Sequence, residues 1–387
     1  MRIIFIFDKK TLYLPHNMQK MKPYIHQMED WPNFHWNNEE IIGLIGEVRN
    51  LQGRIIGKMD VLGFELQNEA VLENLTLDVI KSTEIEGEIL NPDQVRSSIA
   101  RRLGMNISGL VLSERNVDGV VDMMLDATQK FTKKLTKERL YDWHYSLFPT
   151  GRSGMYKILV GQWRNDSTGP MQVVSGALGK EKVHFQAPDS VYIDKEMCIL
   201  LEWFNSTENI EPLIKAAIAH LWFITIHPFE DGNGRIARAL TDLLLARADG
   251  VSQRFYSMSS QIRVERKSYY EILEKTQQGN LDITNWIKWF LNCLLDALGT
   301  SNITLEKVIQ KHKFWNRNSI LIQNERQKLM LNKLLDRFEG KLTSSKWAKI
   351  TKCSPDTALR DIQDLIKKGI LRKEMAGGRS TNYELIV

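Results

Sequence analysis

The segment "HPFEDGNGRIAR", residues 227–238, places a histidine, two acids, two glycines and two arginines between two strongly apolar stretches. Closely spaced glycines at the start of a predicted helix direct several backbone N–H groups at one point, where the helix dipole adds partial positive charge. Such a turn binds phosphate, and Gly232 and Gly234 allow an anion to approach the backbone closely. Arg235 and Arg238 lie on one helical face and supply guanidinium groups for bidentate phosphate contacts.

The other polar residues of this segment have the chemistry of group transfer. Asp231 is a hard oxygen ligand that can hold Mg²⁺ together with phosphate oxygens and water, and Asn233 can position a phosphate or ribose oxygen. His227, with an unperturbed pKa of about 6.5, can accept a proton from a hydroxyl nucleophile. A base beside a metal-bound phosphate predicts phosphoryl or nucleotidyl transfer. The alternative is a structural turn in which Asp231 caps the second helix and His227 belongs to the core.

Apolar helices are predicted on both sides of this segment. "LIKAAIAHLWFITI" is apolar on every side, which predicts a buried central helix from about 212 to 225. "RIARALTDLLLAR" predicts a second helix that begins where the segment ends. Upstream, "QWRNDSTGPMQVVSGALGKEKVHFQAP" has β-branched residues beside turn formers, which predicts a hairpin or flap from Met171 to Phe185. The rest reads as helices, so the fold class is mainly α.

Length and composition favour a folded protein of two or three domains, since the chain has 387 residues, 43% hydrophobic, 26% charged and 10 prolines. The three cysteines form no C-x-x-C pair, which excludes the usual zinc-ribbon and thioredoxin spacings and favours a reducing cytoplasm. "MRIIFIF" is too short for a signal-peptide core or a membrane span, so we expect no membrane partner. We interpret residues 1–30 as a tail, in which the opening segment is a loose tail or a buried strand and Met18 or Met21 is an alternative first residue.

The basic excess of the chain lies at its C-terminal end. Residues 325–387 hold 14 Lys and Arg against 8 Asp and Glu, while the whole chain has a net charge of +5. Three predicted helices and a hairpin around Gly377 and Gly378 resemble a winged helix-turn-helix. Such a domain binds DNA through basic side chains, here Arg360, Lys367, Lys368, Arg372, Lys373 and Arg379. Asp356, Asp361 and Asp364 on the same predicted recognition helix would repel phosphates, so protein docking or dimer formation is the alternative.

The central segment matches the Fic signature H-P-F-x-[DE]-G-N-G-R-x-x-R at every specified position, and the chain therefore resembles the Fic family. The resemblance implies a mostly helical enzyme that transfers AMP from ATP to a Ser, Thr or Tyr hydroxyl of a target protein or of itself, and releases pyrophosphate. By position it implies that His227 is the base and Asp231 the Mg²⁺ ligand. It also implies that the anion hole is formed by Gly232, Asn233 and Gly234, and that the outer phosphates are bound by Arg235 and Arg238. Ile236 and Ala237 complete this nucleotide-binding segment.

Two further parts of the Fic site follow from the resemblance. A flap that aligns the target segment by strand addition would comprise Val173, Val174, Ser175 and Gly176. "YYEILEKTQQGN" resembles the nucleotide-side helix of the family and would place Tyr269, Tyr270 and Gln277 near the base and ribose. The alternative for the two tyrosines is core packing.

A second carboxylate motif lies upstream. "KSTEIEGEIL" resembles the inhibitory motif [ST]-x-x-x-E-[GN] of Fic proteins, satisfied by Ser82, Glu86 and Gly87. A carboxylate against Arg238 would occupy the guanidinium that the γ-phosphate needs. The alternative is a capping box from Thr83 to Glu86 on a solvated face. In some members the same glutamate orients a water for removal of AMP, so de-AMPylation stays open here.

These features predict five segments: a tail over 1–30, an inhibitory helical region over 31–115, a Fic catalytic domain over 116–300, a linker or helical connection over 301–324, and a winged helix-turn-helix over 325–387. The first functional hypothesis is an autoinhibited, Mg²⁺-dependent protein adenylyltransferase, in the cytoplasm and as a homodimer. The second is a DNA-associated regulator whose Fic core senses a nucleotide with little turnover. A third is a Fic enzyme that uses a different donor or group.

Overall fold

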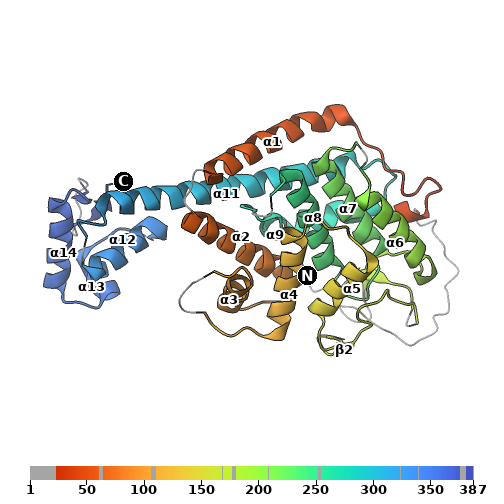
Figure 1. The fold of residues 1–387 in the computed structure, drawn as a ribbon, viewed down its shortest axis with the longest axis horizontal. Helices are drawn as coiled ribbons and strands as arrows, with labels where there is room; N and C mark the ends of the chain where they lie inside the picture. Colours follow the sequence, from red (N-terminus) through yellow and green to blue (C-terminus); the bar gives the residue numbers. More distant parts are fainter. Residues whose placement is uncertain are drawn as a thin grey trace. The chain divides into compact units, whose positions relative to one another are not determined.

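The computed structural model describes residues 23–60, 64–105, 110–167, 169–176, 180–207, 209–251, 254–322, 324–338, 340–374 and 381–386. The chain divides into two compact units, Met1–Ser301 and Asn302–Val387. Both are mainly helical, as predicted, and the described strands form three antiparallel pairs (Figure 1). The predictions for "MRIIFIF", for the turn at Gly377 and Gly378, and for Arg379 concern residues outside the described ones.

The first unit contains most of the helices and two of the strand pairs. Its elements, in chain order, are η1 (Ile25–Gln27), α1 (Asn38–Asp60), α2 (Phe64–Ile85), α3 (Pro92–Arg102), α4 (Arg115–Gln129), α5 (Lys137–Leu147), β1 (Arg152–Ser153), β2 (Tyr156–Lys157), β3 (Gln172–Ser175), β4 (Lys182–Gln186), α6 (Ser190–Asn205), α7 (Pro212–Ile226), α8 (Asn233–Asp249), α9 (Met258–Val264) and α10 (Arg266–Gln277). Helix α11 (Thr284–Asn318) continues past the last residue of this unit.

Helices α7 and α8 form the centre of the first unit. The carboxylate of Glu211 accepts the N–H groups of Leu213 and Ile214, and Pro212 occupies the first turn, where its missing N–H costs nothing. From Leu213 to Ile226 every residue of α7 is buried, so the predicted central helix is confirmed. Helix α8 packs against α7 and α4. The turn between these two helices, residues 227–232, is mostly buried, with Glu230 and Asp231 partly exposed.

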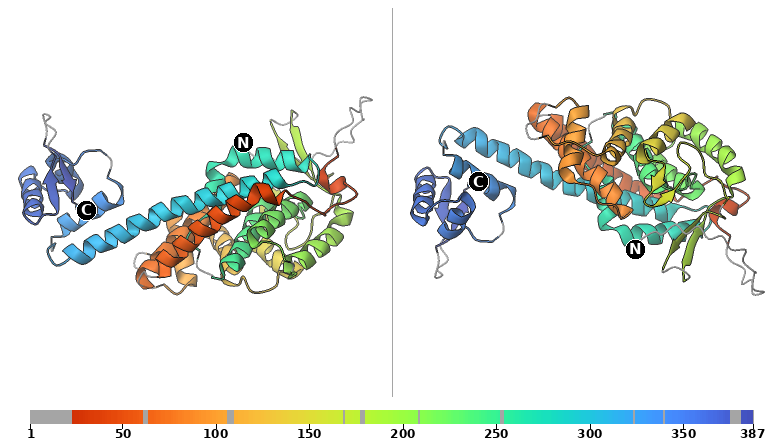
Figure 2. Two further views of the ribbon diagram at one scale, coloured as in Figure 1. Left: turned by 90° about the horizontal axis from the view of Figure 1, so that it is seen from above. Right: turned by 90° about the horizontal axis from the view of Figure 1, so that it is seen from below.

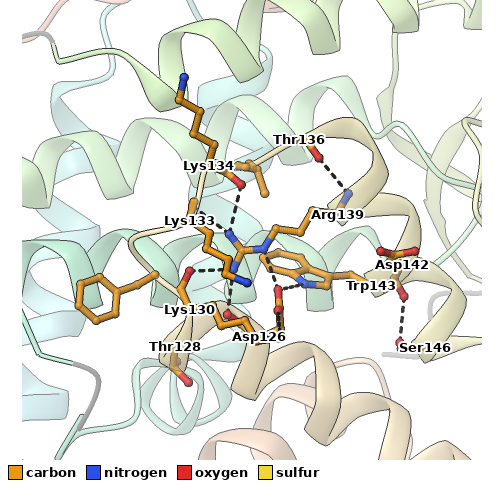
Figure 3. Close-up of polar contacts among 12 residues, drawn as sticks. Asp126, Thr128, Lys130, Lys133, Lys134, Thr136, Arg139, Asp142, Trp143 and Ser146 are labelled. Carbon is orange, nitrogen blue, oxygen red and sulfur yellow. Dashed lines mark hydrogen bonds and ion pairs between the residues drawn. The ribbon is translucent and has the colours of Figure 1, made fainter.

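Helices α4 and α5 are joined through one arginine, whose contacts are drawn in Figure 3. Arg139 Nε donates to Asp126 Oδ2 at 2.7 Å, and its Nη2 donates to the Asp126 carbonyl oxygen at 2.8 Å. Trp143 Nε1 also donates to Asp126 Oδ2, at 2.8 Å. Thr136 caps α5 by accepting the Arg139 N–H. This joint fixes the helix that carries His144, a residue of the site described below.

Helix α2 carries the Ser82 motif at its C-terminal end and is anchored to the start of α9. Asp78 Oδ1 accepts the hydroxyl of Ser257 and the backbone N–H of Ser259, at 2.5 and 3.2 Å. Asp78 also lies 4.0 Å from the guanidinium of Arg254, which pairs with Asp242, and all three side chains are buried. Buried charges are stable only when paired, so this cluster fixes α2 against the α8–α9 region.

Strands β3 and β4 form the predicted hairpin. Val173 pairs with Phe185 and Ser175 with Lys182, and the register shifts between Val173 and Val174. Figure 2 shows this hairpin, in yellow-green, beside the teal helix α10 and the red N-terminal segment. The smaller pair of β1 and β2 was not predicted, because strands of two residues carry no detectable alternation.

The second unit contains α12 (Glu325–Arg337), α13 (Ser344–Thr351), α14 (Pro355–Lys367), β5 (Leu371–Lys373) and β6 (Tyr383–Leu385). These elements follow the predicted order, and their core includes Trp347, Ile362 and Leu365. Strands β5 and β6 are antiparallel, and a bridge from Leu342 to Tyr383 adds a third segment. The winged helix-turn-helix itself stays a prediction. Across the described ranges of both units, no helix is long and apolar enough to cross a bilayer.

Candidate active site

His227 ends α7 in the left-handed conformation, at φ 51° and ψ 59°. Its N–H donates to the Phe223 carbonyl oxygen, and its own carbonyl accepts from Arg164 Nε at 2.8 Å. A histidine in this region is uncommon, and the surrounding bonds hold it there. The chain therefore turns sharply at this residue and directs the imidazole toward the turn before α8.

The imidazole of His227 is held as a proton acceptor. Its Nδ1 lies 3.2 Å from the Ile224 carbonyl oxygen. A carbonyl only accepts, so Nδ1 carries the proton and Nε2 keeps its lone pair. Burial lowers the pKa of His227 to about 4, and the backbone contact to Ile224 offsets this only in part. The ring is therefore neutral through the physiological pH range.

The glycine turn before α8 has the geometry of an anion site. Gly232 has φ 83°, and a Cβ there would lie 2.9 Å from the Phe148 ring, so only glycine fits without strain. Helix α8 begins at Asn233. Among the described residues, no protein acceptor binds the N–H groups of Asn233, Gly234 or Arg235. These amides at a helix N-terminus are available to an anionic ligand.

Asn233 serves the turn itself. Its Oδ1 accepts the Phe229 N–H at 3.0 Å and its Nδ2 donates to the Phe229 carbonyl oxygen at 2.8 Å. The side chain is 1% exposed. Asn233 therefore closes the loop before α8, so the expected contact of its amide with a phosphate or ribose oxygen is limited to its remaining N–H.

Asp231 presents its carboxylate between the turn and the β1–β2 hairpin. Its Oδ2 accepts the Ser153 hydroxyl, its Oδ1 accepts the Gly232 N–H, and Arg235 Nη2 lies 3.9 Å from Oδ1. The Asp231 carbonyl oxygen accepts from His144 Nε2 at 3.1 Å. Because Asp231 binds these groups rather than an amide of the first turn of α8, the helix-capping alternative does not describe it.

Arg238 is paired with the upstream motif. Its Nε donates to the Ser82 hydroxyl at 2.9 Å, and its Nη2 donates to the Ser82 carbonyl oxygen at 2.8 Å and to Glu86 Oε1 at 2.7 Å. Arg238 is 2% exposed, and its Nη1 has no partner in the described structure. A Cβ on Gly234 would lie 2.2 Å from Glu86 Oε1, so this carboxylate lies directly over the turn.

Arg235 contacts a second carboxylate, Glu88, which directly follows the inhibitory motif. Its Nη1 lies 3.2 Å from Glu88 Oε2, and its guanidinium covers the Phe148 ring at 4.9 Å. Glu88 is half exposed, so this ion pair is weaker than the buried contact of Arg238. Both arginines of the signature are thus paired with acids that follow α2.

One cavity of about 540 Å³ brings these parts together. Of the predicted site residues, its walls contain His227, Asp231, Gly232, Asn233, Gly234, Glu86, Val173, Val174, Tyr269, Tyr270 and Gln277. Its walls do not contain Arg235, Ile236, Ala237, Arg238, Ser82, Gly87, Ser175 or Gly176. Glu86, which binds Arg238, is itself part of the wall, whereas Glu88, which binds Arg235, is not.

The nucleotide-side helix α10 contributes both packing and polar groups. Tyr269 is 2% exposed and its hydroxyl lies 2.8 Å from His220 Nε2, so core packing accounts for much of this residue. Tyr270 is less buried and lies beside the Arg266 guanidinium, 5.4 Å from the ring centre. Gln277 Nε2 contacts Thr225 Oγ1 at 3.2 Å, which fixes its amide on the cavity wall.

Three residues that support the site were not found from the sequence. His144 holds the Asp231 backbone, Ser153 holds the Asp231 carboxylate, and Arg164 holds the His227 backbone. Arg164 is 3% exposed, and its Nη2 also donates to the Pro188 carbonyl oxygen. Each residue lies at least 60 positions from its partner, and no local pattern identifies it.

The protein is thus of a class with a helical domain in which an open helix N-terminus, a neutral histidine and a carboxylate face one cavity. Comparison with protein-family models then identifies this domain. The Fic/DOC family model matches residues 134–245, so the chain carries a Fic/DOC domain. A second model, described as a domain of unknown function (DUF4172), matches residues 24–105.

Curated relatives are similar to parts of this chain, and a solved structure shares its fold. Protein adenylyltransferase fic-1 of Caenorhabditis briggsae is 29% identical over 54% of this chain and 42% of the relative, and that of Caenorhabditis elegans is 30% identical over 46% and 32%. The chain thus spans less than half the length of these relatives. A Fic family protein from Desulfovibrio desulfuricans G20 has the same fold, with a TM-score of 0.53, 21% identity, and coverage of 91% of this chain and 97% of the other.

Proposed function

We propose that this chain is an ATP-dependent protein adenylyltransferase that transfers AMP to a Ser, Thr or Tyr hydroxyl of a target protein or of itself. The observation that carries the proposal is the cavity shared by His227, Asp231 and the open amides of Asn233 and Gly234. Relatives named protein adenylyltransferase support the same reaction. In this reaction the hydroxyl oxygen bonds to the α-phosphorus, the bond to the β-phosphate oxygen breaks, and pyrophosphate leaves.

His227 is the proposed base. Its Nε2 lone pair accepts the hydroxyl proton, while Nδ1 stays bonded to the Ile224 carbonyl oxygen. The N–H groups of Gly234 and its neighbours stabilise the negative charge of the phosphates. Arg235 and Arg238 bind the outer phosphates once their acidic partners move away.

Asp231 fits Mg²⁺ as a single protein ligand. The described residues contain no group of three His, Cys, Asp or Glu side chains that could hold a metal ion, so these residues form no all-protein metal site. Mg²⁺ commonly needs one carboxylate together with substrate phosphates and water. The ion would neutralise charge on the phosphates and so favour attack on the α-phosphorus. Ser153 orients the carboxylate for that role.

Glu86 is the proposed inhibitor. Its carboxylate pairs with Arg238 and lies over Gly234, the position that a phosphate would occupy. ATP must either displace this ion pair or bind without its γ-phosphate contact. The inhibition acts within one chain, because Ser82 and Glu86 belong to the segment that ends α2. Removal of AMP by a water that the same glutamate orients stays a prediction, as does a homodimer.

Incubation with α-labelled ATP and Mg²⁺ tests this function. We expect Glu86→Gly to increase AMP incorporation by about tenfold or more, because it frees the Arg238 guanidinium. Adding His227→Ala should then lower the rate by about 10² to 10⁴, the usual contribution of a general base. Glu84→Gly is the matched control, since Glu84 lies two residues away and pairs with Lys81. Equal labelling of the Glu86→Gly and Glu84→Gly forms would contradict the inhibitory role.

A second candidate function, DNA binding by the second unit, gains support from the orientation of its acids. Asp361 is 6% exposed and pairs with Arg326 at 2.9 Å, and Asp364 pairs with Gln327 and Lys368. Arg360 and Lys367 are exposed on the same helix. Two of the three acids that would repel phosphates are therefore neutralised, which leaves Asp356.

A salt series of DNA binding distinguishes this candidate from protein docking. We expect Arg360→Ala together with Lys367→Ala to reduce affinity for duplex DNA and to lower the slope of log K against log salt by about two, one per phosphate contact. Lack of DNA binding by the parental chain at 50 mM salt would leave protein docking as the role of this unit.

A further inference from the structure

Three side chains outside the Fic signature form a hydrogen-bonded chain beside the cavity. His184 Nδ1 lies 2.6 Å from Glu274 Oε2, and its Nε2 lies 2.5 Å from Ser175 Oγ. A carboxylate only accepts, so Nδ1 carries the proton and Nε2 accepts the Ser175 hydroxyl. We call these three residues the 175–184–274 relay. Its members come from β3, β4 and α10.

The relay has the order of a nucleophile, a base and an orienting acid. Its hydroxyl does not have the placement of a nucleophile, however. His184 and Glu274 line the cavity, whereas Ser175 does not. Along β3, Val173 and Val174 both line the cavity, and the strand leaves the cavity wall before Ser175. The relay therefore joins elements and does not aim an oxygen at a bound phosphate.

The relay joins the flap to helix α10, the two walls of the cavity on which the proposed reaction depends. Strand β3 belongs to the flap, which the Fic resemblance assigns to alignment of the target segment. Helix α10 supplies Tyr270 and Gln277 to the nucleotide side. A two-stranded hairpin is marginally stable alone, so its position is set by the side chains that fasten it. Other contacts assist: Gln278 Nε2 donates to the His184 carbonyl oxygen at 2.8 Å, and His26 Nε2 donates to the Gln186 carbonyl oxygen at 2.9 Å.

The exposed fractions of the side chains show which contact between the flap and Glu274 is stronger. The side chain of His184 is 16% exposed and that of Glu274 is 27% exposed, whereas Lys182, which lies 3.4 Å from Glu274, is 68% exposed. Exposed ion pairs contribute little, and shorter, partly buried, charge-assisted hydrogen bonds contribute more. The contact of His184 with Glu274 is therefore the stronger of the two side-chain contacts from the flap to this carboxylate.

We propose that the 175–184–274 relay holds the flap at a fixed position over the nucleotide cavity, with His184 as a positioning residue for transfer. Breaking the relay leaves the phosphate turn intact and misaligns the acceptor hydroxyl. The expected effect on the transfer rate rests on the proposed adenylyl transfer. The link between the flap and α10 can be measured separately, in an experiment that does not require enzymatic activity.

The test uses the full chain in the Glu86→Gly form, with Ser175→Ala, Ser175→Thr, His184→Gln, Glu274→Gln and the double variant of His184 and Glu274. Hydrogen exchange of the β3 and β4 amides reports the flap directly. We expect about tenfold faster exchange in Ser175→Ala and His184→Gln, the scale of a local opening equilibrium. Ser175→Thr keeps the hydroxyl and should restore protection. The double variant should be no worse than the worse single variant, because both break one link.

Two functional measurements separate positioning from loss of structure. We expect the affinity for ATP with Mg²⁺ to change by less than about threefold, while self-incorporation of AMP falls about tenfold with an unchanged KM for ATP. Unchanged flap exchange in His184→Gln would overturn the inference. An AMP adduct mapped to Ser175 would also overturn it, because the hydroxyl would then be an acceptor. If no form incorporates AMP, the proposed function fails, and the exchange data still decide the relay.

Discussion

At the scale of single residues, the site depends on how burial sets protonation and pairing. His227 is neutral because it is buried, and its Nδ1 contact leaves Nε2 as the acceptor. The signature residues themselves could be predicted from the sequence, since glycine, histidine and arginine at this spacing have few structural uses. Their environment could not, because Arg164, Ser153 and His144 reach the turn from distant segments.

The pKa of His227 predicts the pH dependence of transfer. A base must be unprotonated, and a pKa of about 4 keeps this imidazole neutral above about pH 5. We expect the rate of AMP incorporation by the Glu86→Gly form to stay level from pH 8 to about pH 5.5, and to fall only below that. A decline centred near pH 6.5, the titration of an ordinary histidine, would contradict this environment.

Glu88 provides a graded test of the inhibitory contacts. It pairs with Arg235, but its side chain is 51% exposed, so the pair is weak. In the Glu86→Gly form we expect Glu88→Gln to lower the KM for ATP by about two- to fivefold, an electrostatic effect that added salt should reduce. Equal KM values at low salt with and without Glu88→Gln would show that Arg235 is not limited by this carboxylate.

At the scale of elements, the periodicity of apolar residues in the sequence predicted the central helices, but it did not predict which distant residues contact one another. Helices α7 and α8 were predicted because their apolar residues recur at helical spacing, and Pro212 marks a start. The β1–β2 pair escaped because two-residue strands have no pattern. The 175–184–274 relay escaped because its members lie about 90 residues apart in sequence, from 184 to 274, and only the packed fold brings them together.

The joint between α4 and α5 yields a stability prediction (Figure 3). Arg139 is 11% exposed and bonds both the side chain and the backbone of Asp126. We expect Arg139→Ala to lower the free energy of unfolding by about 2 kcal/mol, because Asp126 loses two charge-assisted hydrogen bonds while it keeps its contacts with Lys130 and Trp143. The control Arg96→Ala removes an exposed pair with Glu69 and should cost less than about 1 kcal/mol. Urea unfolding of both variants measures the difference, and similar losses would contradict the joint.

At the scale of the whole molecule, His144, His220 and His227 are buried in the first unit. Burial lowers the pKa of His144 and His227 to about 4 and that of His220 to about 3. Each stays neutral in the folded state at a pH where the unfolded chain, with a pKa of about 6.5, binds a proton. Asp242 opposes them, because burial raises its pKa and the folded state then holds a proton that the unfolded state has lost.

The balance of these groups fixes the sign of the pH dependence of stability. Between about pH 6.5 and pH 4 the unfolded state gains protons on these three histidines and on His26, whose pKa burial also lowers, while burial raises the pKa of Asp242 and Asp249 in the folded state. The histidines outnumber the two acids, so stability falls as pH falls. We expect the thermal midpoint at pH 5 to lie about 10 °C below that at pH 7.5. A midpoint that rises on acidification would show that the three histidines are solvated and protonated in the folded protein.

The central claim is that the 232–234 turn binds the phosphates of ATP while His227 faces the α-phosphorus. A crystal structure of the Glu86→Gly form with ATP and Mg²⁺ tests it most directly. We expect phosphate oxygens on the amides of Asn233, Gly234 and Arg235, and His227 Nε2 on the side of the α-phosphorus where an acceptor hydroxyl enters. A triphosphate bound elsewhere in the cavity, with these amides turned to other partners, would contradict it.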